Sequence, residues 1–257
     1  MKDDLGKRMK ENYEHRTRVF LPRRTYTLIR LDGKAFHSYT AGMKRPFDEE
    51  FASVMDHTAM SLCKEIQGAN FAYTQSDEIT ILLTDFEKIT TDAWFNGNVQ
   101  KMVSVSASMA SAYFNNIVVQ NRIKKVFKFK EVEDLKLAFF DARVWTMSDP
   151  IEVENNLIWR QKDAVRNSIS MHAQSLYSHE ELKHKSQSNM LDMIHEKGEN
   201  WNKMDPGFKR GRTIVKESYI IDNKKNTNTT RTRWVVKHSD FLCDRESLTN
   251  LIPKFGY

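Results

Sequence analysis

The order of strand-like and helix-like segments restricts the fold of this chain more than any other feature. Short β-prone runs are distinguished from helical stretches, in which apolar residues recur every three or four positions. The order is strand, helix, strand, strand, helix, strand, over residues 25–31, 49–66, 71–75, 78–83, 92–116 and 136–145. This order predicts an α+β, ferredoxin-like βαββαβ arrangement, a four-stranded antiparallel sheet with its helices on one face.

Local signals mark where the helices begin and end. Asp48 precedes the first helical stripe as an N-cap, and Gly68 follows it. Asp92 is expected to open the second helix, and Asn115-Asn116 is expected to end it. Each helix therefore has an expected start and an expected stop.

The chain beyond residue 150 has a different pattern. It becomes helical after Pro150, with a second helical stretch over about residues 182–197. From about residue 205, two β-prone pieces, 211–222 and 230–237, flank a polar Asn/Thr-rich link. They predict a C-terminal helical layer and a small β-hairpin.

Charge and composition restrict the class of protein. The 257 residues are 40% hydrophobic, which is enough for one large domain or for one domain with an appendage. A formal net charge of +6 favours an anionic partner, although solubility alone can explain such an excess. Cys63 and Cys243 lie far apart, which predicts neither a disulfide framework nor a thiolate zinc site. Without a signal-peptide core or a run of about 18 apolar residues, we expect a cytoplasmic protein that does not enter a membrane.

Acidic residues meet at one end of the predicted sheet. In a ferredoxin-like sheet the first and third strands are antiparallel neighbours, so the end of the first lies beside the start of the third. Asp32 should therefore lie near the Ser76-Asp77 turn and Glu78. Because side chains alternate faces along an extended strand, we expect one of Asp77 and Glu78 to join Asp32.

Such a carboxylate pair favours a particular chemistry. Two close carboxylates repel unless a cation neutralises them. Hard oxygen ligands suit Mg²⁺, which binds one or two carboxylates together with phosphate oxygens and water. A two-metal site of this kind performs nucleotidyl or phosphoryl transfer. Asp-Gly at a strand end and Ser-Asp in a hairpin are also ordinary turns, and the residues alone leave both interpretations open.

Three segments resemble a known family. RLDGKAFHSY (30–39), AYTQSDEITIL (72–82), and FDARVWTMSDP followed by WRQKD (140–150 and 159–163) are similar to the tRNA-histidine guanylyltransferase family, which includes related enzymes that repair truncated tRNA 5′ ends. The resemblance covers about residues 20–220. It implies a polymerase-palm sheet and 3′-to-5′ extension of tRNA with GTP, ATP and other NTPs. It also implies a palm-like catalytic domain over 1–149, a C-terminal region over 150–257, and a homotetramer.

The resemblance also implies site residues. Asp32, Asp77 and the Gly33 carbonyl would hold two Mg²⁺ ions, with Glu78 as a companion acid. The loop Gly33-Lys34-Ala35-Phe36-His37 corresponds to the segment that holds the triphosphate. Further phosphate or nucleotide contacts are expected from Arg45, Ser76, Lys101, Lys197, Asp163 and Asn167.

One position departs from the family. Enzymes specific for tRNA-histidine carry a histidine where this chain has Val165, and that histidine is tied to the choice of tRNA. The resemblance therefore favours template-dependent repair of tRNA 5′ ends over guanylate addition restricted to tRNA-histidine. A nonenzymatic tRNA-binding protein and a nucleotide cyclase are the alternatives from other classes.

Two basic segments are candidates for contacts with RNA phosphates. Residues 122–130 and 224–237 each carry five Lys or Arg residues. Trp234 could stack on a base, although an aromatic residue in a hairpin more often packs within the protein. The histidines outside the 30–39 segment, and the methionines Met102 and Met109, are expected on the surface or in the core.

Overall fold

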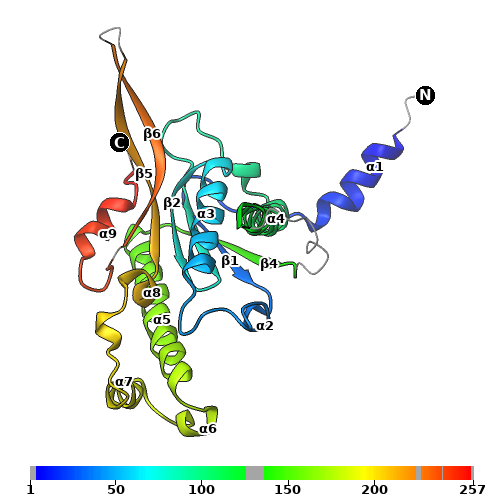
Figure 1. Cartoon of the computed structure of the whole chain (residues 1–257). Helices are drawn as coiled ribbons and strands as arrows, with labels where there is room; N and C mark the ends of the chain where they lie inside the picture. Colours follow the sequence, from blue (N-terminus) through cyan, green and yellow to red (C-terminus); the bar gives the residue numbers. More distant parts are fainter. Residues whose placement is uncertain (1–3, 126–135, 224–226, 239, 256–257) are drawn as a thin grey trace.

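A computed structural model describes residues 4–125, 136–223, 227–238 and 240–255 of the chain (Figure 1). The β-strands are β1 (Tyr26–Gly33), β2 (Ala69–Gln75), β3 (Glu78–Leu83), β4 (Phe140–Met147), β5 (Arg212–Asn223) and β6 (Thr227–Lys237). The α-helices are α1 (Leu5–Asn12), α2 (Phe36–Tyr39), α3 (Glu49–Glu65), α4 (Val99–Lys125), α5 (Pro150–Leu176), α6 (His179–Leu182), α7 (Gln187–Glu196), α8 (Pro206–Arg210) and α9 (Arg245–Leu251).

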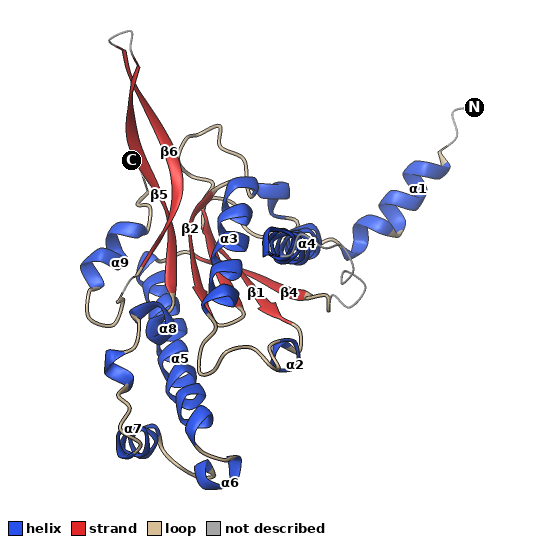
Figure 2. Ribbon diagram, in the orientation of Figure 1, coloured by secondary structure: helices blue, strands red, loops and turns tan. Residues whose placement is uncertain are grey.

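The strands form one antiparallel sheet in the order β4-β1-β3-β2-β5-β6 (Figure 2). Its first four strands have the predicted ferredoxin-like order, so the predicted palm topology is confirmed. The predicted C-terminal hairpin is also present, with strands of 12 and 11 residues. It is joined to β2 and extends the same sheet. Thr227–Thr230 of the predicted polar link belong to β6, and residues 224–226 lie outside the described part.

Helices cover both faces of the sheet. Successive side chains of each strand point to opposite sides, so both faces carry apolar side chains that need to be buried. Ile29 and Leu31 of β1 are buried in the cluster that includes α3 and α4. Tyr26 and Leu28 are buried in a second cluster, which includes residues of α5 and α9. Burying one such side chain contributes about 1.5–3 kcal/mol. The C-terminal helices therefore complete the core on the second face.

The start of α3 follows the sequence signal. The Asp48 carboxylate accepts a hydrogen bond from the Phe51 N–H at 2.9 Å, which satisfies a free donor of the first turn. The chain leaves the helix at Ile66 and turns through Gly68, whose φ is +81°. A Cβ on Gly68 would lie 2.5 Å from the Thr84 carbonyl oxygen, so the turn requires glycine.

Both predicted ends of α4 were wrong. Asn98 caps its start, where its side chain accepts from the Lys101 N–H at 3.0 Å, whereas Asp92 lies 3.5 Å from Arg23. The helix continues past Asn115, whose side chain bonds both the N–H and the C=O of Ala138. This side chain attaches α4 to the segment before β4 and so does not end the helix.

Helix α4 is apolar enough to resemble a membrane span. By length and composition alone, residues 99–123 qualify, with a mean hydropathy of 1.2. It is not an uninterrupted run of about 18 apolar residues, because Ser, Asn and Gln residues interrupt it. In the fold, Met102, Ala110 and Phe114 of this helix lie in the core beneath the sheet. Part of the apolar surface of α4 therefore packs on α3 and β4, while 22% of its apolar 18-residue window is buried.

Helix α5 runs along the second face of the sheet. Asp149 caps it, with a hydrogen bond from the Ile151 N–H at 2.8 Å. The helix carries Arg160, Asp163 and Asn167, which line one cavity together with Asp32 at the end of β1. The second predicted helical stretch is divided into α6 and α7.

Candidate active site

The register of β1 and β3 brings the acidic residues together. Asp32 is paired with Glu78, and the Gly33 N–H donates to the Asp77 carbonyl at 3.2 Å. Ser76 and Asp77 form the two-residue turn between β2 and β3, and Ser76 has a φ of +48°. Because Asp77 lies in this turn, the expected choice between Asp77 and Glu78 does not arise. Both side chains line one cavity with Asp32.

This acidic cavity has a volume of about 310 Å³. It opens where β1 ends, between the β2–β3 turn and α5. Its lining is almost entirely polar and consists of Arg30, Asp32, Gln75, Ser76, Asp77, Glu78, Arg160, Asp163 and Asn167. Six of the predicted site residues therefore meet in one place.

The electrostatics of Asp77 show how close the acids are. Burial raises the pKa of Asp77 above its ordinary value, and the charge of Asp32 raises it further. Hydrogen bonds from its own backbone and from Ser76 oppose this shift. Among the described residues, neither Asp32 nor Asp77 forms an ion pair with Lys or Arg. Arg30 and Arg160, which line the same cavity, are directed to Glu78.

The raised pKa of Asp77 predicts how the metal-free protein responds to pH. The folded state binds this proton more tightly than the unfolded state, so stability falls as pH rises from the unfolded pKa through the folded pKa of Asp77. In EDTA, Asp77→Asn should raise the melting temperature slightly at neutral pH and leave it nearly unchanged near pH 3. Thermal unfolding monitored by circular dichroism at both pH values checks this. An equal loss of stability by the variant at both would contradict the assignment.

Glu78 is held differently from the two aspartates. Its two carboxylate oxygens accept hydrogen bonds from Arg160 Nε at 2.8 Å and Nη2 at 2.6 Å. Burial raises the pKa of Glu78, and the Arg160 charge opposes that rise. Arg30 Nε lies 4.0 Å away on the neighbouring strand. Glu78 thus anchors α5 to the sheet, and its role as a companion acid stays a prediction.

A chain of ion pairs with alternating charge runs from Glu78 along α5. Arg160 also donates to Asp163 at 2.9 Å, and Asp163 pairs in turn with Arg166. The ring of Trp159, which is 52% exposed, lies 4.5 Å from the Arg160 guanidinium. Arg160 is thus fixed from three sides, and its position fixes Asp163 beside the acidic cavity.

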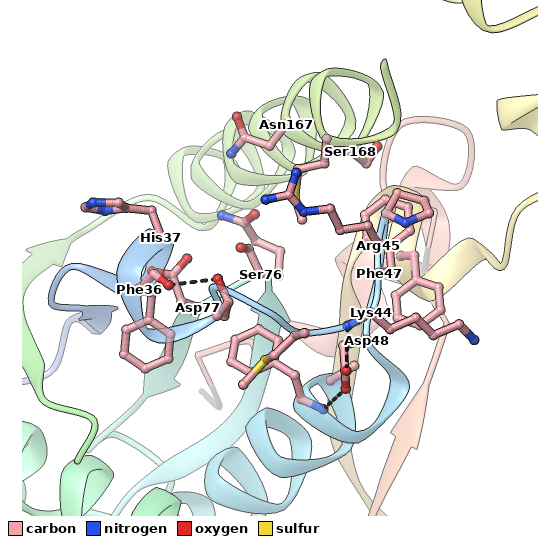
Figure 3. Close-up of a pocket in the computed structure, with 18 of the residues that line it drawn as sticks. Phe36, His37, Lys44, Arg45, Phe47, Asp48, Ser76, Asp77, Asn167 and Ser168 are labelled. Carbon is pink, nitrogen blue, oxygen red and sulfur yellow. Dashed lines mark hydrogen bonds between the residues drawn. The ribbon is translucent and has the colours of Figure 1, made fainter. Parts of the chain in front are cut away.

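A larger cavity of about 580 Å³ lies next to the acidic one (Figure 3). Gln75, Ser76, Asp77 and Asn167 line both cavities. The remaining walls of the larger one come from the loop before α3, α2, the second half of α5 and α8. Its lining includes the predicted contacts Gly33, Ala35, Phe36, His37 and Arg45, together with Lys44, Phe47, Asp48, Met171 and Phe208.

The loop after β1 has little freedom. The ring of Phe36 is buried among Tyr39, Phe51, Phe114 and Phe140. A Cβ on residue 33 would lie 2.3 Å from this ring, so the close approach requires glycine. The backbone of the loop is therefore held at the cavity wall by an aromatic anchor.

Three predicted contacts lie outside the two cavities. Lys34 is exposed, and its N–H donates to the Phe139 carbonyl at 2.8 Å. Lys101 lies at the start of α4, with its ammonium 5.8 Å from the Phe95 ring. Lys197 follows α7, 5.0 Å from the Tyr177 ring. None of these three lysines lines either cavity among the described residues. Their contacts with nucleotide or RNA stay predictions.

The donor set of the acidic cavity fits a divalent ion that a substrate helps to bind. No group of three or more His, Cys, Asp or Glu side chains within the described segments could hold a metal alone. Asp32 and Asp77 supply two carboxylates that form no ion pair with a described Lys or Arg residue, since Arg30 and Arg160 of this cavity are directed to Glu78. Mg²⁺ accepts one or two protein carboxylates and completes its coordination with phosphate oxygens and water.

Sequence reasoning missed three residues of this region. Arg160 lies in the WRQKD segment, but its partner Glu78 is 82 positions away in the chain, so no local pattern reveals the pair. Arg30 lines the acidic cavity. It lies two residues before Asp32 in the same strand, and because residues two apart share a face, the sequence alone could have placed it beside Asp32. Asp141 is paired with Asp32 on the opposite neighbouring strand and points to the same face of the sheet.

An antiparallel sheet with this order, and with paired acids at the end of β1 and in the β2–β3 turn, has the plan of a nucleotidyltransferase palm. A family profile described as "tRNAHis guanylyltransferase" matches residues 6–148, more than half of the chain. The chain therefore belongs to the tRNAHis guanylyltransferase family, whose members are nucleotidyltransferases.

Two relatives of known sequence align with most of the chain. An uncharacterized protein, R259, of Acanthamoeba polyphaga mimivirus is 30% identical over 239 residues, which cover 88% of this chain and 81% of the relative. A probable tRNA(His) guanylyltransferase of Dictyostelium discoideum is 22% identical over 239 residues, covering 86% and 87%.

Solved structures agree as well. A bacterial tRNA(His) guanylyltransferase-like protein in complex with ATP superposes with a TM-score of 0.84 and 40% identity, covering 97% of this chain and 99% of that chain. Such a protein in complex with GTP gives a TM-score of 0.79 and 39% identity, with the same coverage. The Saccharomyces cerevisiae enzyme shares the fold, with a TM-score of 0.64, 21% identity, and coverage of 80% and 93%.

Proposed function

We propose that this protein is a template-dependent 3′-to-5′ nucleotidyltransferase that adds nucleotides to the 5′ end of truncated tRNA after activation of that end by ATP or GTP. The observation that carries the proposal is the acidic pair, Asp32 and Asp77, which lines one cavity and whose Asp77 also lines the larger cavity beside it. The ATP and GTP complexes of the bacterial guanylyltransferase-like protein support nucleotide use at a fold of this kind.

Two Mg²⁺ ions, held by Asp32, Asp77 and the Gly33 carbonyl, would neutralise the carboxylates and phosphates and lower the pKa of the attacking hydroxyl. The loop from Gly33 to His37 and the exposed Arg45 border the larger cavity, where the triphosphate is proposed to lie. Asn167 lines both cavities and is placed to donate a hydrogen bond to substrate across their junction.

The proposed reaction has two steps. In the first, an oxygen of the tRNA 5′-monophosphate attacks the α-phosphorus of ATP, the bond between the α- and β-phosphates breaks, and pyrophosphate leaves, so that the 5′ end of the tRNA becomes adenylylated. The 3′-hydroxyl of an incoming NTP then attacks the 5′ phosphate of the tRNA, and AMP leaves as the new phosphodiester bond forms. This chain contributes mainly position and electrostatics, which carry most of the catalysis in phosphoryl transfer.

Substrate range is proposed from one substitution. Val165 cannot make the polar contacts of the histidine that the tRNA-histidine-specific members carry there, and it packs with the cluster around Trp201. A template strand would select each NTP by base pairing, so the protein needs no guanine-specific reading. Guanylate addition confined to tRNA-histidine is the second candidate, favoured by the names of the curated relatives.

An extension assay separates these functions. A panel of 5′-truncated, 5′-monophosphorylated tRNAs is incubated with ATP, the four NTPs and Mg²⁺, and products are resolved on a sequencing gel. We expect template-matched addition to several tRNAs. Addition to tRNA-histidine alone would favour the restricted enzyme. Salt-sensitive tRNA binding without any addition would favour a nonenzymatic binding protein, and mass spectrometry would reveal a cyclic nucleotide.

The assembly state and compartment are also proposals. We propose a cytoplasmic homotetramer, in keeping with the family. Helix α1 has no buried residue in the described chain and projects from the sheet layer (Figure 1), and Met9 is 41% exposed. An exposed helix of this kind supports association with other subunits. Sedimentation velocity measures the assembly state directly.

A further inference from the structure

The β5–β6 hairpin reaches far beyond the rest of the sheet (Figure 1). Strand β5 pairs with β2 only from Arg212 to Val215. Past Val215, its residues pair solely with β6 within the described chain, as far as Asn223. The outer part of the hairpin is therefore a two-stranded ribbon. Within the described chain, no third strand pairs with it beyond Val215.

The register assigns side chains to the two faces of this ribbon. Val215 and its partner Val235 pack in the core cluster that includes α9. Because directly paired residues share a face and faces alternate along each strand, Tyr219, Arg231 and Arg233 lie on that same side. Trp234 is on the other side, where it packs against the cluster of α3, so its interpretation as a packing residue is confirmed.

The side that carries Tyr219, Arg231 and Arg233, here called the arginine face, has an excess of positive charge. The acidic residue on this face, Glu217, forms an ion pair with Lys237, whose Nζ lies 2.7 Å from Glu217 Oε1. Arg231 and Arg233 are exposed and form no ion pair with the described residues. The Arg233 guanidinium lies 5.4 Å from the Tyr219 ring, and 37% of Tyr219 is exposed.

The arginine face is distant from the acidic pair. Arg212, at the start of β5, is paired with Thr74 close to the β2–β3 turn. Tyr219 lies seven residues further along the strand, which corresponds to about 23 Å at 3.3 Å per residue. A nucleotide bound at the cavities cannot span this distance, whereas an RNA with a helical stem can.

We propose that the arginine face binds the phosphate backbone of RNA at a distance from its reacting 5′ end. This inference rests on the proposed function, because it extends the same substrate along the protein. Arginine presents a planar set of donors that matches phosphate oxygens, and the Tyr219 ring holds one guanidinium in place. Such contacts fix the position of the RNA without reading its sequence, as an enzyme acting on several tRNAs requires.

The variant Arg231→Gln/Arg233→Gln tests the surface, with Lys216→Gln as the matched control on the opposite side of the hairpin. Binding of full-length tRNA is measured by fluorescence anisotropy over a range of salt concentrations. We expect the double variant to lose at least about 10-fold in affinity near 0.1 M salt. The slope of log affinity against log salt should decrease by about 1.5–2, because about two phosphate contacts are lost. Lys216→Gln should change affinity less than about 2-fold.

Two further measurements separate this surface from the active site. Extension of a short 5′-monophosphorylated stem, too short to reach the hairpin, should be equal in the double variant and the wild type. Arg231→Lys/Arg233→Lys should retain most of the salt slope, because it retains the charge. A double glutamine variant with wild-type affinity and slope would overturn the proposal, as would an equal loss on short and long RNA. If the wild type binds tRNA through this face but adds no nucleotide, the proposed function fails and the surface remains.

Discussion

Asp77→Asn is expected to lower the rate of nucleotide addition at least about 1,000-fold, because a neutral amide cannot hold a divalent ion against the nucleotide phosphates. Asp77 lies in the turn that lines both cavities, and it shares the acidic one with Asp32. Asp32→Asn should have a loss of similar size. Single-turnover extension at saturating tRNA, over a range of Mg²⁺ concentrations, measures the effect.

The matched control for this loss is Asp192→Asn, an exposed aspartate of α7. It should extend tRNA at the wild-type rate. Because Asp77→Asn is expected to be at least as stable as the wild type without metal, a loss of activity cannot be attributed to unfolding. Asp77→Asn and Asp32→Asn should still bind tRNA, because each removes a negative charge that would repel the RNA phosphates. Wild-type rates in Asp77→Asn would remove the basis of the proposed function.

Arg160→Ala should destabilise the fold by about 3–5 kcal/mol, because it removes both hydrogen bonds that Arg160 donates to the buried Glu78 carboxylate and leaves only the more distant Arg30, whose Nε lies 4.0 Å away. The side chains of Arg160 and Glu78 are 6% and 7% exposed, and two hydrogen bonds join them. For a chain of this size the melting temperature should fall by about 10 °C. Thermal and urea unfolding measure the change.

Two comparisons test this explanation. Arg166→Ala removes an arginine that is 61% exposed and pairs with Asp163, and it should cost less than about 1 kcal/mol. The double variant Glu78→Met/Arg160→Met replaces the whole pair with apolar groups and should recover most of the lost stability. If Arg160→Ala cost no more than Arg166→Ala, the pair would not be the anchor between α5 and the sheet.

The parts of the fold that depend on periodicity were predictable. The predicted order of elements makes the first and third strands antiparallel neighbours, which places Asp32 opposite the start of β3, and the register confirms that placement. The end of α4 was not predictable, because the Asn115 side chain bonds the backbone of Ala138, 23 positions later. Asn-Asn is a helix stop only when its amides have no such partner.

The candidate site was predictable to the same extent. The acids and the loop after β1 follow from local motifs, and their meeting follows from topology. The engagement of Glu78 by Arg160 depends on how α5 crosses the sheet, which no pattern in the chain specifies. The nucleotide contacts of Lys101 and Lys197 rest on the resemblance alone and stay predictions, because neither side chain lines the two cavities among the described residues.

The β2–β3 connection consists of only two residues, and this has a consequence for motion during turnover. The backbone of Asp77 is restrained at three points. The paired strands β2 and β3 lie directly before and after the turn, and the Gly33 N–H donates a hydrogen bond to the Asp77 carbonyl. Any opening or closing around a substrate must therefore come from the walls, the segment before α3 and the outer turns of α5, moving against a stationary acidic floor.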